Sequence, residues 1–220
     1  AEGREMNESY RTVDLTHRLE SGMSIYPGDR PEPQITTQVG SQYTTSEIQI
    51  GSHYGTHLDA PRHFLPGGKT IDEFDVGQFT GPALCLPREY SGAMALDLTI
   101  DELEAIRQLQ PHWLIVRTGF DRFWGRPDYF QAHPYLSAEF ARQLVELKIS
   151  GIGIDFPSVD AADAADRNYP VHHLLMEHEI LILENLTNLT DLPLGKLFTL
   201  TALPLKIDAD GAPARVVASF

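Results

Sequence analysis

Short apolar runs separated by polar turns are the main pattern along the chain. The runs at 113–116, 149–154 and 180–183 are flanked by polar or turn-forming residues, which is typical of strands buried in a parallel or mixed sheet. Further along, residues 198–207 and 214–220 flank the turn-forming segment 208–211. The pattern therefore predicts several buried strands followed by a C-terminal β-hairpin.

Two other segments have apolar residues at the three- and four-residue spacing of an amphipathic helix. In the first, Thr99 and Glu102 form a capping-box pattern, and in the second, Ser137 can cap the helix. The apolar stripes that follow consist of Leu103, Ile106 and Leu109, and of Phe140, Leu144 and Leu147. Because strands alternate with these helices, the sequence predicts a single compact α/β domain with a mixed sheet.

Composition excludes several classes of function. The 220-residue chain has 17 Lys and Arg against 31 Asp and Glu, a formal net charge of −14, which argues against binding nucleic acid or an anionic membrane. The single cysteine, Cys85, excludes an internal disulfide and a cysteine-based zinc site, and we expect it to be buried. No apolar run approaches the roughly twenty residues of a membrane-spanning helix. We expect a polar tail without a signal peptide at 1–12, a domain at 13–220 and a cytoplasmic location.

The segment 51–64 carries the densest group of chemically active side chains. An extended chain would place its odd-numbered residues on one face, and these include His53, His57, Asp59 and His63. Glu47 and Gln49 would continue this polar face. The even-numbered positions would form the opposite, buried face: Ile48, Ile50, Tyr54 and Leu58. We therefore expect a strand-like segment that presents its polar side chains together, with bends at Gly55 and Pro61.

The residue types in this segment indicate a metal site. Imidazole and carboxylate groups together favour Zn, Mn or Fe over Ca or Mg. Three protein ligands with an open position are typical of a catalytic site, whereas structural zinc sites usually contain cysteine. A helical zinc-protease motif does not fit, because Gly55 lies inside the histidine pair and Tyr54 stands where that motif has its glutamate. The pattern predicts a catalytic metal site on extended backbone.

A second group of titratable residues lies in the last third of the chain. Glu184 ends the apolar run at 180–183, where an acidic side chain is unfavourable unless it is paired or bound to a metal. Of His172 and His173, one is expected at a helix surface. Asp155 also ends an apolar run, and it either lines a crevice at the strand end or has reached solvent. Two nearby residues are expected to be solvated: His178 and Glu179.

One eleven-residue run matches a known signature without a departure: His53-Tyr-Gly-Thr-His57-Leu-Asp59-Ala-Pro61-Arg-His63. The signature is His-x-Gly-Thr-His-x-Asp-x-Pro-x-His, and with it the chain resembles the cyclase family of metal-dependent hydrolases. That family contains bacterial kynurenine formamidases and isatin hydrolases. The resemblance extends over about residues 13–220, with further matching segments that include Tyr26-Pro-Gly-Asp29, Thr118-Gly-Phe-Asp121 and Ile182-Leu-Glu184-Asn-Leu186.

The resemblance implies a fold, a metal and a set of roles. The fold is a swivelling β/β/α domain, and members are commonly dimers or higher oligomers, so a homodimer or homotetramer is expected. The metal is Zn²⁺ or Mn²⁺, with one or two ions per chain. The catalytic residue is His63. The implied ligands are His53, His57, Asp59 and Glu184, together with His172, which is chosen over His173 because the family pattern places this histidine twelve positions before the glutamate.

The resemblance also implies hydrolysis of an amide-type C–N bond in a small molecule, with N-formylkynurenine as the first candidate. Alternatives are ring opening of isatin-like lactams, cyclic imides or lactones, a metal-dependent lyase or cyclase reaction, and metal binding without catalysis. Tyr26 departs from the tryptophan that kynurenine formamidases typically have before Pro-Gly-Asp. Aromatic residues able to wall a substrate pocket are Tyr26, Phe64 and Trp124, with Phe120 and Phe123 as further candidates.

Overall fold

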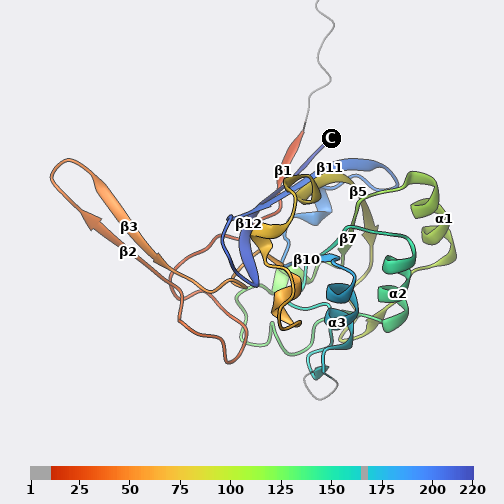
Figure 1. The fold of residues 1–220 in the computed structure, drawn as a ribbon, viewed down its shortest axis with the longest axis horizontal. Coiled ribbons are helices and arrows are strands. Elements are labelled where there is room, and N and C mark those ends of the chain that lie inside the picture. Colours follow the sequence, from red (N-terminus) through yellow and green to blue (C-terminus); the bar gives the residue numbers. More distant parts are fainter. Residues whose placement is uncertain (1–10, 165–167) are drawn as a thin grey trace, which may run out of the picture.

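The computed structural model describes residues 11–164 and 168–220, which form one α/β domain around an eight-stranded mixed sheet (Figure 1). The strands of this sheet are β1 (Thr12–Asp14), β4 (His57–Asp59), β5 (Thr80–Pro87), β7 (Trp113–Arg117), β9 (Gly151–Ile154), β10 (Leu181–Glu184), β11 (Leu197–Pro204) and β12 (Gly211–Ser219). Across the sheet they follow the order β1-β12-β11-β5-β7-β9-β10-β4. The predicted α/β class, mixed sheet and C-terminal hairpin are confirmed.

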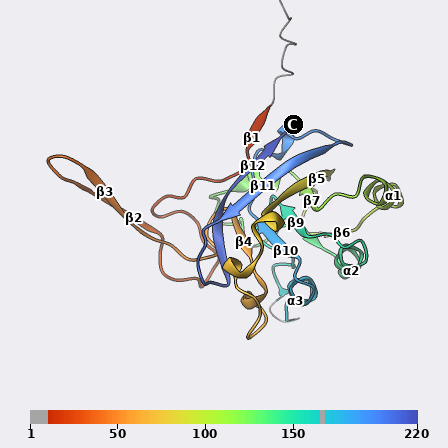
Figure 2. The same cartoon turned by 45° about the horizontal axis from the view of Figure 1, so that its top comes forward.

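The strand β12 closes this sheet into a ring. Along one edge it pairs first with β4 and then with β1, and along its other edge it pairs with β11. Because β4 also pairs with β10, the strands surround a common interior (Figure 2). Within the ring β5, β7, β9 and β10 run parallel. At the two edges of this group, β11 pairs antiparallel with β5 and β4 pairs antiparallel with β10, and β12 pairs antiparallel with both β11 and β4. This closed ring of strands, called the barrel below, brings segments that lie far apart in the sequence to the same end of the domain.

Apolar side chains pack on both faces of the ring. Along β7, Trp113 and Ile115 belong to the inner cluster, whereas Leu114 and Val116 belong to the outer cluster that the helices cover. This alternation is the period-two pattern of a strand that is buried on both sides. Gly151 makes room for the indole inside the ring, since a Cβ there would lie 2.3 Å from the Trp113 ring.

The α-helices of the described residues are α1 (Ile100–Leu109), α2 (Ala138–Glu146) and α3 (Pro170–Glu177), and they lie together on one side of the barrel (Figure 1). The two predicted helices are confirmed with their caps. The Thr99 hydroxyl accepts the Glu102 amide, while the Glu102 carboxylate accepts the Thr99 amide. Ser137 caps α2 by accepting the Phe140 amide. Two short strands, β6 (Ala95–Leu96) and β8 (Tyr135–Leu136), pair beside these helices.

A separate hairpin of β2 (Gln34–Val39) and β3 (Thr44–Gln49) extends away from the barrel (Figure 1). The expected buried face is wrong in β3, because Ile48 is 61% exposed. Alternation alone cannot bury a face, and these two strands pair only with each other. The expected bends at Gly55 and Pro61 are present, since the chain turns between residues 50 and 57 and Pro61–His63 forms a 3₁₀ turn, so that only the short β4 between them is a strand. Tyr54 and Leu58 are buried as expected.

Three smaller expectations can be compared with the structure. Cys85 is buried in the barrel interior, as predicted. Most of the expected tail, residues 1–10, lies outside the described residues, and Thr12 already belongs to β1. Within the described ranges, none of the helices combines the length and the apolar character that crossing a membrane requires.

Candidate metal centre and active-site pocket

The pairing of β4 with β10 places acidic and imidazole side chains next to each other. His57 and Asp59 are two residues apart on β4 and therefore point to the same side of the strand. In the antiparallel register Glu184, the last residue of β10, lies opposite His57. All three side chains are buried, which is unusual for groups that are charged in water.

A second imidazole, His172, reaches this cluster from α3. The Asp160 carboxylate accepts the backbone amides of Val171 and His172 at 3.0 and 2.9 Å in the first turn of the helix. The same carboxylate accepts the His172 Nδ1–H at 2.7 Å. Asp160 therefore fixes both the start of the helix and the orientation of the imidazole, a role that the sequence did not reveal.

Ligand atoms of these four residues face one another at short range. His57 Nε2 lies 3.2 Å from Asp59 Oδ1 and 3.6 Å from Glu184 Oε2. His172 Nε2 lies 3.7 Å from Asp59 Oδ2 and 3.5 Å from Glu184 Oε1. Two ligand atoms at about 2.1 Å from one tetrahedral ion are about 3.4 Å apart, so this donor set fits a divalent metal.

The outer nitrogens of the two imidazoles support the same interpretation. The His57 Nδ1–H donates to the Gly55 carbonyl at 2.9 Å, as the His172 Nδ1–H does to Asp160. Each ring thereby turns its Nε2 lone pair toward the carboxylates, which is the arrangement found around metal-bound histidines. No lysine or arginine of the described residues pairs with Asp59 or Glu184. Although burial alone would raise the pKa of Asp59, the facing His53 and His57 hold it well below its usual value.

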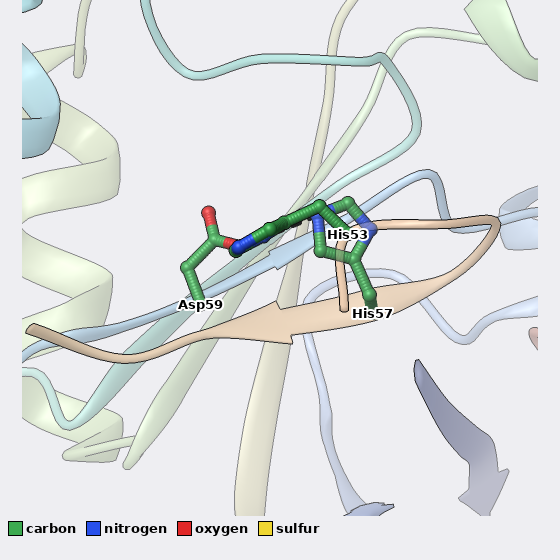
Figure 3. Close-up of side chains that lie close together, drawn as sticks. All are labelled: His53, His57 and Asp59. Carbon is green, nitrogen blue, oxygen red and sulfur yellow. Dashed lines mark hydrogen bonds and ion pairs between the residues drawn. The ribbon is translucent and has the colours of Figure 1, made fainter. Parts of the chain in front are cut away.

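His53 lies beside this cluster on the turn that precedes β4 (Figure 3). Its Nδ1 is 2.7 Å from Asp59 Oδ1, and its Nε2 is 2.8 Å from Asp210 Oδ2. Burial favours the neutral ring, but the two carboxylates outweigh it and raise the pKa of His53 to about 10. Asp59 thus shares one oxygen with His53 and His57 and turns the other toward His172.

His63 completes the histidine group from the 3₁₀ turn after β4. Its ring stacks on His53 with centroids 3.8 Å apart, and its side chain is 30% exposed at the pocket. Its Nδ1 lies 3.3 Å from Asp210 Oδ2. The sequence analysis missed Asp210, because its segment indicates only a hairpin turn. The structure therefore brings together His53, His57, Asp59, His172, Glu184 and His63 and adds Asp210 beside them.

A pocket of about 270 Å³ opens over these side chains. Of the expected aromatic walls, Tyr26, Phe64 and Trp124 line it. Two more aromatic lining residues, Phe130 and Tyr169, were not found from the sequence. Phe120 and Phe123 do not line the pocket, and this expectation is corrected: they pack in the outer core beside Tyr90. The pocket is apolar at its walls and polar at its base.

The remaining titratable residues lie outside the cluster. Asp155 is fully buried and accepts hydrogen bonds from the amides of Thr118 and Gly119 at 2.8 and 2.7 Å. It thus holds a loop together, which neither expected alternative, a crevice or solvent, describes. His173 is only partly buried and lies 3.3 Å from the Asn168 amide nitrogen. His178 and Glu179 are exposed, as expected.

Comparisons with known proteins agree with this geometry. A family described as "Putative cyclase" matches residues 13–161. The kynurenine formamidase of Bacillus cereus is 34% identical over 210 residues, which is 93% of this chain and 95% of the relative. Isatin hydrolase A from Ralstonia solanacearum superimposes with a TM-score of 0.78 at 27% identity, over 96% of this chain and 92% of that one.

A further solved structure is described as a potential metal-dependent hydrolase with cyclase activity. It superimposes with a TM-score of 0.74 at 26% identity, covering 96% of this chain and 98% of that one. The family match covers more than half of the chain, and the curated relative is matched over nearly its whole length. The chain belongs to the cyclase family of hydrolytic enzymes.

Proposed function

We propose that this enzyme hydrolyses an aryl amide C–N bond in a metal-dependent reaction, with N-formyl-L-kynurenine as the first substrate to consider. The observation that carries the proposal is the buried cluster of His57, Asp59, His172 and Glu184 at the base of an aromatic pocket. The kynurenine formamidase of Bacillus cereus supports the substrate, since it is 34% identical over nearly the whole chain.

Zn²⁺ or Mn²⁺ would be held by His53, His57, Asp59, His172 and Glu184. Two groups of facing ligand atoms share Asp59: one contains His53 and His57, and the other contains His172 and Glu184. This sharing supports up to two ions per chain. A bound ion of this kind supplies hydroxide at neutral pH and polarises the substrate carbonyl.

The chain itself would move the proton and hold the ring. His63 is exposed at the pocket, so its imidazole can accept a proton from the attacking water and then donate one to the leaving nitrogen. Tyr26, Phe64 and Trp124 would hold the aryl group against the site by stacking.

The first experiment is turnover of N-formyl-L-kynurenine by zinc- or manganese-loaded protein, followed by the absorbance of kynurenine. We expect a kcat/KM above about 10⁴ M⁻¹s⁻¹, within the usual range of enzymes on their own substrates. The Asp59→Asn variant is the matched control and should be inactive. A negligible rate with metal bound would contradict the substrate assignment.

Ring opening of isatin is the second candidate. Tyr26 stands before Pro-Gly-Asp in the pocket wall, and isatin hydrolase A shares the fold at 27% identity. Isatin should therefore be assayed beside the formamide, and solvent ¹⁸O should enter the product in either case. Product without solvent oxygen would indicate a lyase or cyclase reaction.

We further propose that residues 13–220 form the hydrolase domain and that two or four copies associate. Support comes from the β2–β3 hairpin, which has large apolar side chains exposed: Val39, Tyr43 and Ile48. An isolated two-stranded hairpin is only marginally stable in water, so a second copy of the chain is the surface expected to cover it.

A further inference from the structure

Asp210 lies outside the proposed ligand set and comes from a distant part of the chain. It occupies the turn between β11 and β12, yet its carboxylate contacts two histidines of the site. One oxygen, Oδ2, lies 2.8 Å from His53 Nε2 and 3.3 Å from His63 Nδ1. The other, Oδ1, accepts the Ser52 hydroxyl at 2.9 Å. A surface turn would not need such a set of partners.

The backbone holds this carboxylate in place. The Asp210 carbonyl accepts the Ala60 amide at 2.9 Å, and the carbonyl of the preceding Ala209 accepts the Ile71 amide at 3.0 Å. The next residue, Gly211, pairs with Asp59 in the β12–β4 ladder. Main-chain bonds to β4, Ala60 and Ile71 therefore anchor the turn, and they do not depend on the Asp210 side chain.

The contacts decide which nitrogen of each imidazole carries its proton. A carboxylate oxygen can only accept from an N–H, so it selects Nε2–H on His53 and Nδ1–H on His63. His63 Nε2 is then the unprotonated nitrogen of its ring. His53 Nδ1 faces Asp59 Oδ1 at 2.7 Å and needs a proton for that bond as well, so the Asp210 contact leaves Nε2–H alone on His53 once a metal takes the place of the Nδ1 proton. A metal ligand and a general base both need a lone pair that is aimed and available.

We propose that Asp210 is a positioning residue that fixes the ring orientation and tautomer of His53 and His63 together. The proposal rests on the function proposed above, because it assigns His53 to the metal and His63 to the proton. One carboxylate thereby couples the metal side of the site to its base, and neither histidine can turn without breaking a bond to the same oxygen. Asp210 itself touches neither metal nor substrate in this assignment.

The test uses the full zinc-loaded chain with Asp210→Ala and Asp210→Asn. Losing an outer partner of this kind typically lowers activity or metal affinity about 10–100-fold, and we expect that loss in kcat for Asp210→Ala, with KM changed less than about 3-fold. The Asn variant keeps one acceptor oxygen and should recover part of the loss. The matched control is Asp208→Ala, an exposed aspartate of the same turn that pairs with Arg62 and should leave kcat unchanged.

A second readout does not depend on turnover. Long-range ¹H–¹⁵N spectra distinguish Nδ1–H from Nε2–H imidazoles, and we expect His63 to change from one tautomer to a mixture in Asp210→Ala. Zinc content, measured by mass spectrometry, should keep the wild-type stoichiometry while competition with a chelator shows weaker binding.

Three outcomes would overturn the proposal. The first is unchanged tautomers in Asp210→Ala, and the second is a kcat equal to that of Asp208→Ala. The third is the loss of one whole equivalent of zinc, which would make Asp210 a ligand. If wild-type protein hydrolyses neither formamide nor isatin, the proposed substrates fail, but the tautomer and zinc readouts still decide the role of Asp210.

Discussion

The side chains of the site differ in how far solvent reaches them, and this difference separates their roles. The side chain of His63 is 30% exposed, whereas those of His57 and His172 are only 3% and 5% exposed. A group that exchanges protons with substrate and water needs access, while a ligand is better shielded. His63 can therefore be removed without opening the cluster beneath it.

We predict that His63→Ala keeps its metal and loses activity. Removing a general acid–base group typically costs about 10²–10⁴-fold in rate, and that loss should appear in kcat. Metal content measured by plasma mass spectrometry should equal that of wild type. His178→Ala, at an exposed histidine that does not line the pocket, is the control. Loss of metal in His63→Ala would make His63 a ligand and contradict the assignment.

His17 lies outside the histidine and carboxylate cluster but packs against Trp124 of the pocket wall, and it allows the effect of burial on stability to be tested. Its ring stacks on Trp124 with centroids 4.1 Å apart, and its buried Nε2 has no partner among the described residues. Burial lowers the pKa of His17 to about 4, against an attraction from Asp121 that raises it. The folded protein therefore holds this imidazole neutral.

We predict that His17→Phe makes stability less sensitive to acid. The folded pKa of His17 is below the unfolded value, so its contribution is full above about pH 6.5 and is lost as pH falls toward 4, by ~3 kcal/mol in all. Urea unfolding at pH 7.5 and 5.0 should show wild type losing about 2 kcal/mol more than the variant. Equal losses in the two proteins would contradict the burial argument.

At the scale of elements, local patterns identified the helices α1 and α2, the central strands β7, β9 and β10, and the C-terminal hairpin of β11 and β12. Thr99 and Ser137 mark helix starts because a cap is satisfied within a few residues. The segment 44–63 shows the limit of this reasoning. Its alternation indicates an extended chain, but β4 is fixed by β10 and β12, which lie more than a hundred residues away. The same applies to Asp210, whose partners are set by the register of a distant hairpin.

The candidate ligand residues could be found from the sequence, but the contacts that orient them could not. His53, His57 and Asp59 stand out because they are close in sequence, Glu184 stands out as an acid at the end of an apolar run, and the choice of His172 over His173 came from the resemblance. The second-layer residues could not be predicted in this way. Asp160 acts through the first turn of α3, and the Gly55 carbonyl acts through the bend before β4. Such contacts depend on how elements meet, which no local spacing encodes.

The contact between β12 and β4 leads to a third prediction, at Gly211. A Cβ at this position would lie 2.5 Å from the Leu58 carbonyl and 2.8 Å from His53 Cε1. Gly211→Ala should therefore displace the His53 ring, weaken metal binding and destabilise the fold by about 1–3 kcal/mol. Chelator competition and thermal unfolding measure the two effects.

Gly195→Ala separates this effect from ordinary backbone strain. Gly195 has φ +66° and nothing within 4 Å of an added Cβ, so the variant should cost about 1 kcal/mol of stability and leave metal binding unchanged. If Gly211→Ala kept the wild-type metal affinity, the His53 ring would be able to move away from the added methyl group without weakening metal binding.

For the molecule as a whole, the proposed metal would cross-link separate elements of the fold. Its ligands come from the turn before β4, from β4, from α3 and from β10. Without an ion, the buried Asp59 and Glu184 pair only with imidazoles and, for Glu184, with the Val159 amide, among the partners that the described residues provide. Metal binding and folding stability should therefore be strongly linked.

We predict that chelation lowers the melting temperature. An ion at 100 times its Kd adds about 2.7 kcal/mol, which for a chain of this size is about 5–10 °C. Differential scanning calorimetry with EDTA, and then with excess zinc, should show a reversible shift. Asp59→Asn should respond much less to zinc. Identical melting temperatures with and without EDTA would argue against a resident metal.

The projecting hairpin gives a prediction about assembly. Replacing Val39, Tyr43 and Ile48 by serine should reduce the mass measured by light scattering from an oligomer to a monomer, because it removes the exposed apolar side chains of β2–β3. Val76→Ser, an exposed apolar residue outside the hairpin, is the control. An unchanged mass in the triple variant would place the interface elsewhere.

The closure of the barrel by β12 also affects how the protein folds while the ribosome is still synthesising it. About 150 residues separate β4 from β12, and at about 5–20 residues per second a ribosome needs about 8–30 seconds to make them. During that interval the nascent chain carries His53, His57 and Asp59 without the strand that closes over them. Any ion captured then meets only part of the ligand set. The centre should therefore mature only after β12 has emerged.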